Sequence, residues 1–521
     1  MSSSRSSDAA SVANRFGLGA MPGTLDSLHD PRGMLAQQVR TPPVNTDAFA
    51  GLTRSADYLA AEIDFQRDRR ARKRDLEAAN DSDGKAGAKG ATDGDGDRFK
   101  PDSAKPDSAK ADSIKADQVK ALGDGFRKEF GPQLLAEGAA RWQVALNVPI
   151  GFDERIVRFW SNHFAVSVDK RAALLYAAPM EREVIRPLAF GRFQDLLLGV
   201  ETHPAMLRYL DNAASIGPDS RFGARATAFE SAAAAQPKRK AGLNENLARE
   251  ILELHTLGVN GGYTQADVTE LARAITGWST QGPRDGRFGG GLSGATPDST
   301  TGFIYRENTH EPGARTILGK RYAEGGMEQG RSVLADLALN PATAKHLSFK
   351  LARHFVADQP PPKLVQHMAV AYLESGGDLR ALYLAMLQGD EAWSPEARKF
   401  RTPDDFLLAA LRALGTRQVE DVRRIAGLLA RLGQPSFVPR SPAGFADTAD
   451  AWIGPDALWK RIQTAEELSL HAPRSLVPAQ VARDALGSRL DAATAQAIAR
   501  ADSPTQALAL LFASPDFQWR I

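Results

Sequence analysis

The sequence predicts a mostly α-helical protein, a multi-helix globular bundle with long loops and one disordered insertion. Two observations lead to this fold class. Beyond about residue 110 the apolar residues recur with the 3.6-residue period of a helix, and no run of alternating polar and apolar residues indicates a strand. Between roughly 78 and 110 the chain lacks the apolar residues that build a core.

The composition excludes several classes of protein. The 521 residues include 65 Lys and Arg, 63 Asp and Glu, and no cysteine. The near balance of charge favours neither a nucleic-acid nor a membrane partner, and thiol nucleophiles, thiolate metal sites and disulfides are excluded. No stretch reaches the roughly 20 apolar residues of a membrane span, and the first residues lack the apolar region of a secretory signal. We expect a cytoplasmic protein, with export to the periplasm alongside a partner as the alternative.

The first part of the chain, residues 1–77, is predicted to be helical. GLGAMPG at 17–23 predicts a turn, because no strand precedes it and its glycine spacing is not that of a dinucleotide-binding loop. RDRRARKRD at 67–75 is typical of a solvated helix end. A five-residue repeat then runs from Lys100 to Val119. We predict that 78–110 is a disordered low-complexity linker, and that 111–521 is the main helical domain, packing with 1–77 as one unit.

A helix is predicted in DERIVRFWSNHF, at 153–164. Ile156, Phe159, Trp160 and His163 share one helical face, so His163 is expected to point into the core, with Asn162 beside it. A single histidine on an apolar face is usually structural. A second histidine in similar surroundings, described below, favours a shared site.

Helix starts are predicted where a capping residue precedes proline. THPAML, NPATAK, SPEARK and SPDFQW place His203, Asn340, Ser394 and Ser514 in that position. For His203 the capping role and a functional role remain equal alternatives. Residues 213–242 and 279–302 are rich in small residues and predict loops or insertions.

Two helices around a glycine loop are predicted in NENLAREILELHTLGVNGGYTQADVTELARAITGW, at 244–278. Gly258, Gly261 and Gly262 permit the positive φ that ends the first helix. Thr264 and Asp267 form a capping box at the start of the second. Its buried face consists of Val268, Leu271, Ala272, Ile275 and Trp278.

The first of these helices carries Glu250 and His255 within its apolar arc. A buried carboxylate has to be paired, protonated or bound to metal, because leaving it alone costs several kcal/mol. One hypothesis is a structural pair that sets the helix register. The other is a general base or metal ligand at a functional site.

A candidate site follows from these residues. We predict a pocket in which Glu250, His255 and His163 are catalytic. His163, Glu250, His255 and His310 are the expected ligands if a divalent metal is bound, and Asn162 and Asn244 orient them. His346 and His354 are interpreted as ordinary surface or half-buried residues. HExxH, Walker and GxSxG signatures are absent.

Several long blocks resemble one bacterial family, the domain of unknown function 1800. The blocks are NRFGLGAMPG, RFWSNHFAVS, THPAMLRYLDN, the 244–278 segment, HEPGARTILGKRY, NPATAKHLSFKLARHFV and SPDFQWR. The resemblance covers nearly the whole chain except the linker, and it implies no particular reaction. It also implies a partner, because members often neighbour a sulfatase-like protein of the domain-of-unknown-function 1501 family. Members often carry an export signal, which this sequence lacks.

Two functions are therefore expected. The first is an enzyme-like bacterial protein with a His/Glu pocket, acting through a metal or through acid–base chemistry. The alternative is a non-catalytic helical scaffold that binds the sulfatase-like neighbour. The observation that separates them is whether His163, Glu250 and His255 converge in one pocket.

Overall fold

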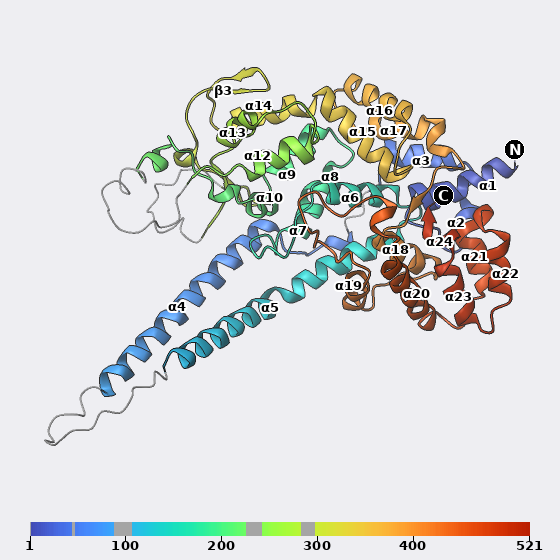
Figure 1. The fold of residues 1–521 in the computed structure, drawn as a ribbon, viewed down its shortest axis with the longest axis horizontal. Coiled ribbons are helices and arrows are strands. Elements are labelled where there is room, and N and C mark those ends of the chain that lie inside the picture. The colour runs from blue at the N-terminus through green and yellow to red at the C-terminus, as the bar shows by residue number, and fades with distance from the viewer. Residues whose placement is uncertain (1, 44–46, 88–106, 226–241, 283–296, 521) are drawn as a thin grey trace.

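The computed structural model describes residues 2–43, 47–87, 107–225, 242–282 and 297–520 (Figure 1). In this part of the chain the fold is mostly α-helical, with only short antiparallel strand pairs, as the periodicity predicts. Helices carry α labels, strands β labels, and short 3₁₀ or π turns η labels.

The N-terminal half combines helices of the body with one long helical hairpin, α4 and α5. Its elements are α1 (Ser2–Ser11), η1 (Val12–Phe16), α2 (Thr24–Ser27), α3 (Pro31–Arg40), η2 (Asp47–Phe49), α4 (Ser55–Gly87), α5 (Asp107–Asn147), α6 (Phe152–His163), α7 (Ala177–Met180), η3 (Glu181–Ile185), α8 (Arg186–Leu188), α9 (Phe193–Glu201), α10 (Pro204–Tyr209), η4 (Asn212–Ala214), α12 (Asn246–Glu250), η5 (Ile251–His255) and α13 (Gln265–Ala274).

The C-terminal half adds the strands and the remaining helices. Its elements are β1 (Trp278–Thr280), β2 (Phe303–Tyr305), η6 (Glu307–Thr309), β3 (Arg315–Ile317), β4 (Lys320–Tyr322), α14 (Met327–Ala338), α15 (Pro341–Phe355), α16 (Pro362–Glu374), α17 (Leu379–Gln388), η7 (Asp390–Trp393), β5 (Lys399–Phe400), α18 (Pro403–Ala413), α19 (Val422–Arg431), η8 (Ala449–Ala451), α20 (Pro455–Leu470), α21 (Pro478–Leu486), η9 (Gly487–Arg489), α22 (Ala492–Ala499), α23 (Pro504–Ala513), α24 (Pro515–Gln518) and β6 (Trp519–Arg520).

The helices α4 and α5 project from the body as an antiparallel arm (Figure 1). Near its base the two helices are joined by aromatic packing, with the ring of Phe65 5.6 Å from that of Phe126 and 5.9 Å from that of Phe130. The linker expected at 78–110 falls at the far end of this arm. Residues 88–106 lie outside the described residues, whereas the backbone at 78–87 and 107–110 continues α4 and α5.

Three two-stranded antiparallel pairs stand beside the helices in the described part of the chain: β1 with β2, β3 with β4, and β5 with β6. The pair β5–β6 brings the C-terminal end of the chain against Lys399 and Phe400.

Apolar residues form two cores. The larger is built around α6, α9, α13 and the α14–α17 helices. The smaller is built from the end of α5, from α18 and α19, and from α20 to α24. Between them runs a layer of buried charged groups, in which Arg155 of α6 donates to Asp405 of α18 at 2.7 Å. The candidate site described below lies along this layer.

Most of the predicted helix starts are confirmed. The side chains of His203, Asn340 and Ser514 each accept a hydrogen bond from the backbone of the following helix, and Thr264 with Asp267 forms the expected capping box. The turn predicted at 17–23 is also present, with positive φ at Gly19 and Gly23.

Two of the helices predicted from the sequence differ from those in the structure. No helix follows Ser394, because the chain turns toward β5 and the Arg15 guanidinium binds the carbonyl oxygens of Ser394 and Ala397. The helix expected to reach Trp278 ends at Ala274, and Trp278 begins β1 after a positive φ at Gly277. Its predicted buried face is nevertheless right, since Val268, Leu271, Ala272, Ile275 and Trp278 have no exposed surface.

Among the described residues, no helix combines the length and the apolar character that are needed to cross a membrane.

Candidate functional site

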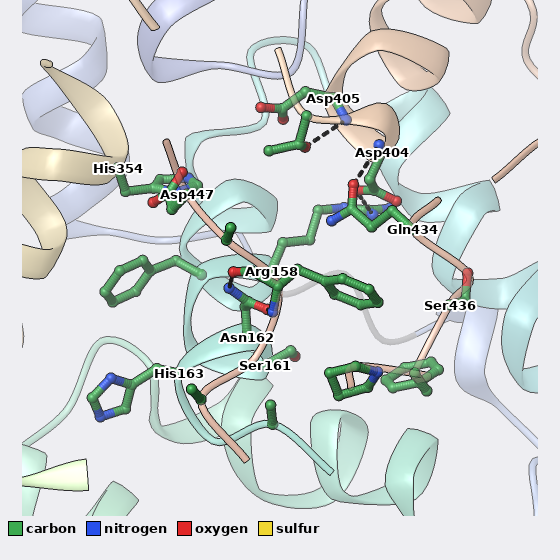
Figure 2. Close-up of a pocket in the computed structure, with 18 of the residues that line it drawn as sticks. Arg158, Ser161, Asn162, His163, His354, Asp404, Asp405, Gln434, Ser436 and Asp447 are labelled. Carbon is green, nitrogen blue, oxygen red and sulfur yellow. Dashed lines mark hydrogen bonds and ion pairs between the residues drawn. The ribbon is translucent and has the colours of Figure 1, made fainter. Parts of the chain in front are cut away.

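A cavity of about 300 Å³ opens between α6, α15, the start of α18 and the loop 434–447 (Figure 2). Its walls carry five arginine or lysine side chains and three aspartates, together with His354 and His163. The basic members are Arg141, Arg155, Arg158, Lys350 and Arg353, and the acidic members are Asp404, Asp405 and Asp447. Positive charge therefore exceeds negative charge among the lining residues. A concave site of this kind concentrates anions.

Arg158 presents half of its guanidinium without a partner. Its Nη1 donates to Asp404 at 2.5 Å, whereas Nε and Nη2 are buried and have no hydrogen-bond partner among the described residues. The residue is only 9% exposed. Burial, together with the nearby Arg141, lowers the pKa of Arg158. In Figure 2 the side chain extends toward Asp404 and Gln434.

The free edge of Arg158 has the geometry of a fork. Nε–H and Nη2–H point in the same direction on the planar guanidinium, which is the arrangement that binds both oxygens of a carboxylate or two oxygens of a phosphate. A charged donor left unpaired in a buried position costs at least about 1–3 kcal/mol. A carboxylate or phosphate placed here would accept both hydrogen bonds.

His354 and Asp447 form an acid–base pair on another wall. The Nδ1 atom of His354 lies 2.9 Å from Asp447 Oδ2, and Nε2 of His354 has no partner among the described residues. Burial lowers the pKa of His354 although Asp447 opposes the shift. The neutral imidazole therefore donates from Nδ1 to the carboxylate and keeps a lone pair on Nε2, which is the state of a general base.

Lys350 also borders the cavity, and its ammonium makes no hydrogen bond or ion pair with any described residue. Burial lowers its pKa to about 8, and the neighbouring Arg353 acts in the same direction while Asp447 opposes it. On α15 it lies four residues after His346 and four before His354, so the three side chains share one helical face.

The loop 434–447 closes the cavity through Asn162. The amide of Asn162 donates to the Phe445 carbonyl oxygen at 2.9 Å and accepts from the Phe445 backbone N–H at 2.8 Å. A Cβ at Gly444 would lie 2.3 Å from the Asn162 carbonyl oxygen, so glycine permits this close approach. Asn162 therefore holds the cavity wall. The sequence predicted that it orients a histidine, but both of its side-chain hydrogen bonds go to Phe445.

His163 and His255 do come together. Both are buried, their ring centroids lie 6.1 Å apart, and His163 Nε2 donates to the His255 carbonyl oxygen at 3.1 Å. The pKa of His163 lies well below its usual value, chiefly because of burial and also because of Lys350. In Figure 2 the ring of His163 points away from Arg158. His163 thus borders the cavity, whereas His255 is not among the lining residues and lies buried in the core.

The partner of His255 is Glu201 and not Glu250. His255 Nδ1 lies 2.7 Å from Glu201 Oε1, and neither side chain is exposed. Glu250 is half-buried, and burial raises its pKa. The partner of His255 could not be identified from this helix alone, because Glu201 lies on α9, 54 residues away in the sequence.

The other two predicted site residues lie elsewhere. His310 Nδ1 donates to the Thr276 carbonyl oxygen at 2.9 Å, and its ring packs 5.7 Å from that of Tyr305. Asn244 accepts a hydrogen bond from the Asn246 backbone and so caps the start of α12. Across the described ranges, no three His, Asp or Glu side chains are placed to hold a metal ion. The structure therefore gives the predicted metal set no support.

A Ser–His–Glu group occurs at His203 but lacks the geometry of a hydrolase triad. Ser55 Oγ and Glu183 Oε2 both lie 3.2 Å from the same atom, His203 Nε2. His203 Nδ1 instead accepts from the Ala205 backbone. In a triad the acid and the nucleophile contact opposite ring nitrogens. The capping alternative for His203 is thus confirmed.

Sequence reasoning missed the charged lining of the cavity. Arg155 and Arg158 occupy polar positions of an otherwise apolar helix, and this is a signal that could have been followed. His354 had been interpreted as ordinary, although it contacts Asp447, 93 residues further along the chain. No local pattern links these two positions.

Comparison with known protein families shows to which family the chain belongs. The family described as "Protein of unknown function (DUF1800)" matches residues 11–519. The chain belongs to this family. The resemblance seen in the sequence blocks is confirmed, and the matched range includes every element that lines the cavity. Comparison with curated proteins and with solved structures found no match.

Proposed function

We propose that this DUF1800 protein binds a small organic anion in the cavity between α6, α15, α18 and the loop 434–447. The observation that carries the proposal is the unpaired Nε/Nη2 edge of the buried Arg158. Charge supports it, because the lining holds more arginine and lysine than aspartate. A carboxylate or phosphate on the ligand accepts both hydrogen bonds of the fork.

The enzyme-like function expected from the sequence takes a different form here. Its acid–base group is the His354–Asp447 pair, which lines the cavity, and not Glu250 with His255. The ligand carboxylate is held at Arg158, and His354 accepts a proton from a neighbouring position of the ligand. No metal is needed for this proposal.

The partner-binding alternative is favoured by a different surface. On α20, Trp459 is 59% exposed and Leu470 71%, and Ile462 lies on the same helical face. Exposed aromatic and aliphatic residues grouped on one face are typical of protein contact surfaces. This face is where a sulfatase-like neighbour would dock, and that partner stays a prediction from the family resemblance.

Anion binding is tested by thermal unfolding and calorimetric titration with pyruvate, inorganic phosphate and sulfate at constant ionic strength. We expect at least one of these anions to bind the parent. A ligand at 100 times its dissociation constant raises the free energy of unfolding by about 2.7 kcal/mol. The variant Arg158→Met/Asp404→Asn, which removes the fork without stranding its ion partner, should lose this gain.

The matched control is Arg424→Met, because Arg424 pairs with Glu467 on a partly exposed surface and does not line the cavity. It should bind the same anion as the parent does. The proposal is overturned if none of the three anions binds the parent, or if the Arg158→Met/Asp404→Asn variant binds with unchanged affinity.

A further inference from the structure

The position of Lys350 calls for a chemical explanation. No hydrogen bond joins its ammonium to a described residue, and the Asp447 carboxylate that attracts it is shared with His354 and Lys399. Arg158, on the facing helix α6, already supplies a permanent cation to the same cavity. An arginine cannot lose its proton, whereas a lysine in such surroundings can.

We propose that Lys350 is a nucleophilic amine that forms a Schiff base with an oxo acid, whose carboxylate binds the free edge of Arg158. The inference rests on the proposed anion site and deepens it, because it names the substrate class as a carbonyl compound that carries a carboxylate. Lys350 and Arg158 line one cavity of about 300 Å³, which is large enough for a small organic acid.

The electrostatics of the cavity favour the reactive form of the amine. Burial and Arg353 hold the pKa of Lys350 at about 8, so roughly a tenth of the amine is neutral at pH 7, far more than for an ordinary lysine. Desolvation and a neighbouring cation are the two means by which proteins activate a lysine nucleophile. Asp447 works against the shift, but it is already engaged by His354 and Lys399.

The step balances without an oxidant or reductant. The lone pair of Lys350 Nζ attacks the carbonyl carbon and forms a C–N bond. The carbonyl oxygen takes up protons and leaves as water, and a C=N bond remains between Lys350 and the acid. Protons released by the amine are carried by water and by the Nε2 lone pair of His354, which lines the same cavity.

The experiment is reductive trapping of the full chain with pyruvate and sodium cyanoborohydride, followed by tryptic mass spectrometry. Reduction converts the C=N bond into a stable secondary amine. Trypsin then fails to cut after Lys350, so the modified peptide runs through to Arg353. We expect labelling of Lys350 at least tenfold above that of Lys320, an exposed lysine paired with Asp336. The labelling rate should rise with pH toward 8.

The variant Lys350→Arg separates this inference from the anion site. It keeps the positive charge and removes the nucleophile, so it should still bind the anion that binds the parent while giving no adduct at position 350. Arg158→Met/Asp404→Asn should lose both binding and labelling. If an anion binds the parent but Lys350 is labelled no faster than Lys320, the Schiff-base inference is overturned and the anion site stands. If no anion binds and Lys350 is not labelled, both proposals fail.

Discussion

His255 and Glu201 form a hydrogen-bonded pair whose side chains have no exposed surface. Each group has one further polar atom, His255 Nε2 and Glu201 Oε2, without a partner in the described part of the chain. The pair joins η5 to the end of α9, so it ties together two elements that are separated in sequence. Removing one member leaves the other charged or polar group buried and uncompensated.

We predict that His255→Leu lowers the free energy of unfolding by about 3–5 kcal/mol, measured by urea denaturation. Glu201→Met/His255→Leu should recover most of this loss, because neither polar group is then stranded. Glu250→Gln should stay within about 0.5 kcal/mol of the parent, since Glu250 is half-buried and is not the ion partner. A loss at Glu250 as large as that at His255 would restore the pairing expected from the sequence.

His346 makes the protein sensitive to acid. Burial lowers its pKa from 6.5 to about 4, and Lys350 acts in the same direction. Its Nε2–H donates to the Leu254 carbonyl oxygen at 3.2 Å, so the folded state holds a neutral imidazole. The unfolded chain binds a proton at higher pH than the folded chain does. This contribution to stability is therefore complete above pH 6.5 and is lost as the pH falls toward 4.

We predict that His346→Gln, which keeps an N–H donor but does not titrate, removes part of the acid sensitivity. The loss of unfolding free energy between pH 7 and pH 4 should be smaller in the variant, by up to about 3 kcal/mol. Urea denaturation at a series of pH values measures this difference. If the unfolding free energies of parent and variant change with pH in parallel over the whole range, His346 has the same pKa in the folded and the unfolded state.

At the scale of elements, the loop between η5 and α13 contains two glycines, Gly258 and Gly262, that the backbone requires for different reasons. Gly258 has a φ of +88°, and a Cβ there would lie 2.8 Å from Nδ1 of His346. Gly262 has a φ of +85°, but no atom within 4 Å of an added Cβ. Both lie in the left-handed region, in the loop between η5 and α13, and only Gly258 also accommodates the His346 ring.

We predict that Gly262→Ala costs about 1–2 kcal/mol, the conformational cost of an L-residue in the left-handed region. Gly258→Ala should cost more, because the added methyl group displaces the His346 ring from its hydrogen bond with Leu254. Thermal unfolding of both variants ranks the two positions. Equal losses would mean that the ring moves aside without cost.

At the scale of the molecule, buried arginines join the two cores. Arg412 of α18 donates to the carbonyl oxygens of Gly19, Ala145 and Val148, and Arg155 of α6 donates to Gly17 and to Asp405. Asp405 also faces Arg520 of β6 at 3.4 Å. Although burial alone would raise it, the pKa of Asp405 lies far below its usual value because these cations surround it.

We predict that Asp405→Asn lowers the free energy of unfolding by at least about 3 kcal/mol, because it leaves several buried guanidinium groups without an anion. The control is Asp336→Asn, which removes an exposed pair with Lys320 and should cost less than about 1 kcal/mol. Far-ultraviolet circular dichroism and tryptophan fluorescence should report one coincident transition in both variants. Two separated transitions in the parent would mean that the cores unfold independently.

Features that depend on neighbours along the chain could be predicted from the sequence alone. The helical class, the caps at His203, Asn340 and Ser514, the Thr264–Asp267 box and the burial of His163 and His255 all follow from spacings of a few residues. Capping and helical faces are set by local backbone geometry, so these predictions needed no knowledge of the fold.

The tertiary structure alone decided which charged groups meet. Glu201 reaches His255 from 54 residues away, and Asp447 reaches His354 from 93 residues away. The continuation of α12 as the π turn η5 is likewise not represented by a regular 3.6-residue period. The Arg158–Lys350 cavity exists because packing brings α6, α15 and the loop 434–447 together. The physical reason is that electrostatic pairing depends on distance in space, and only the packed chain determines that distance.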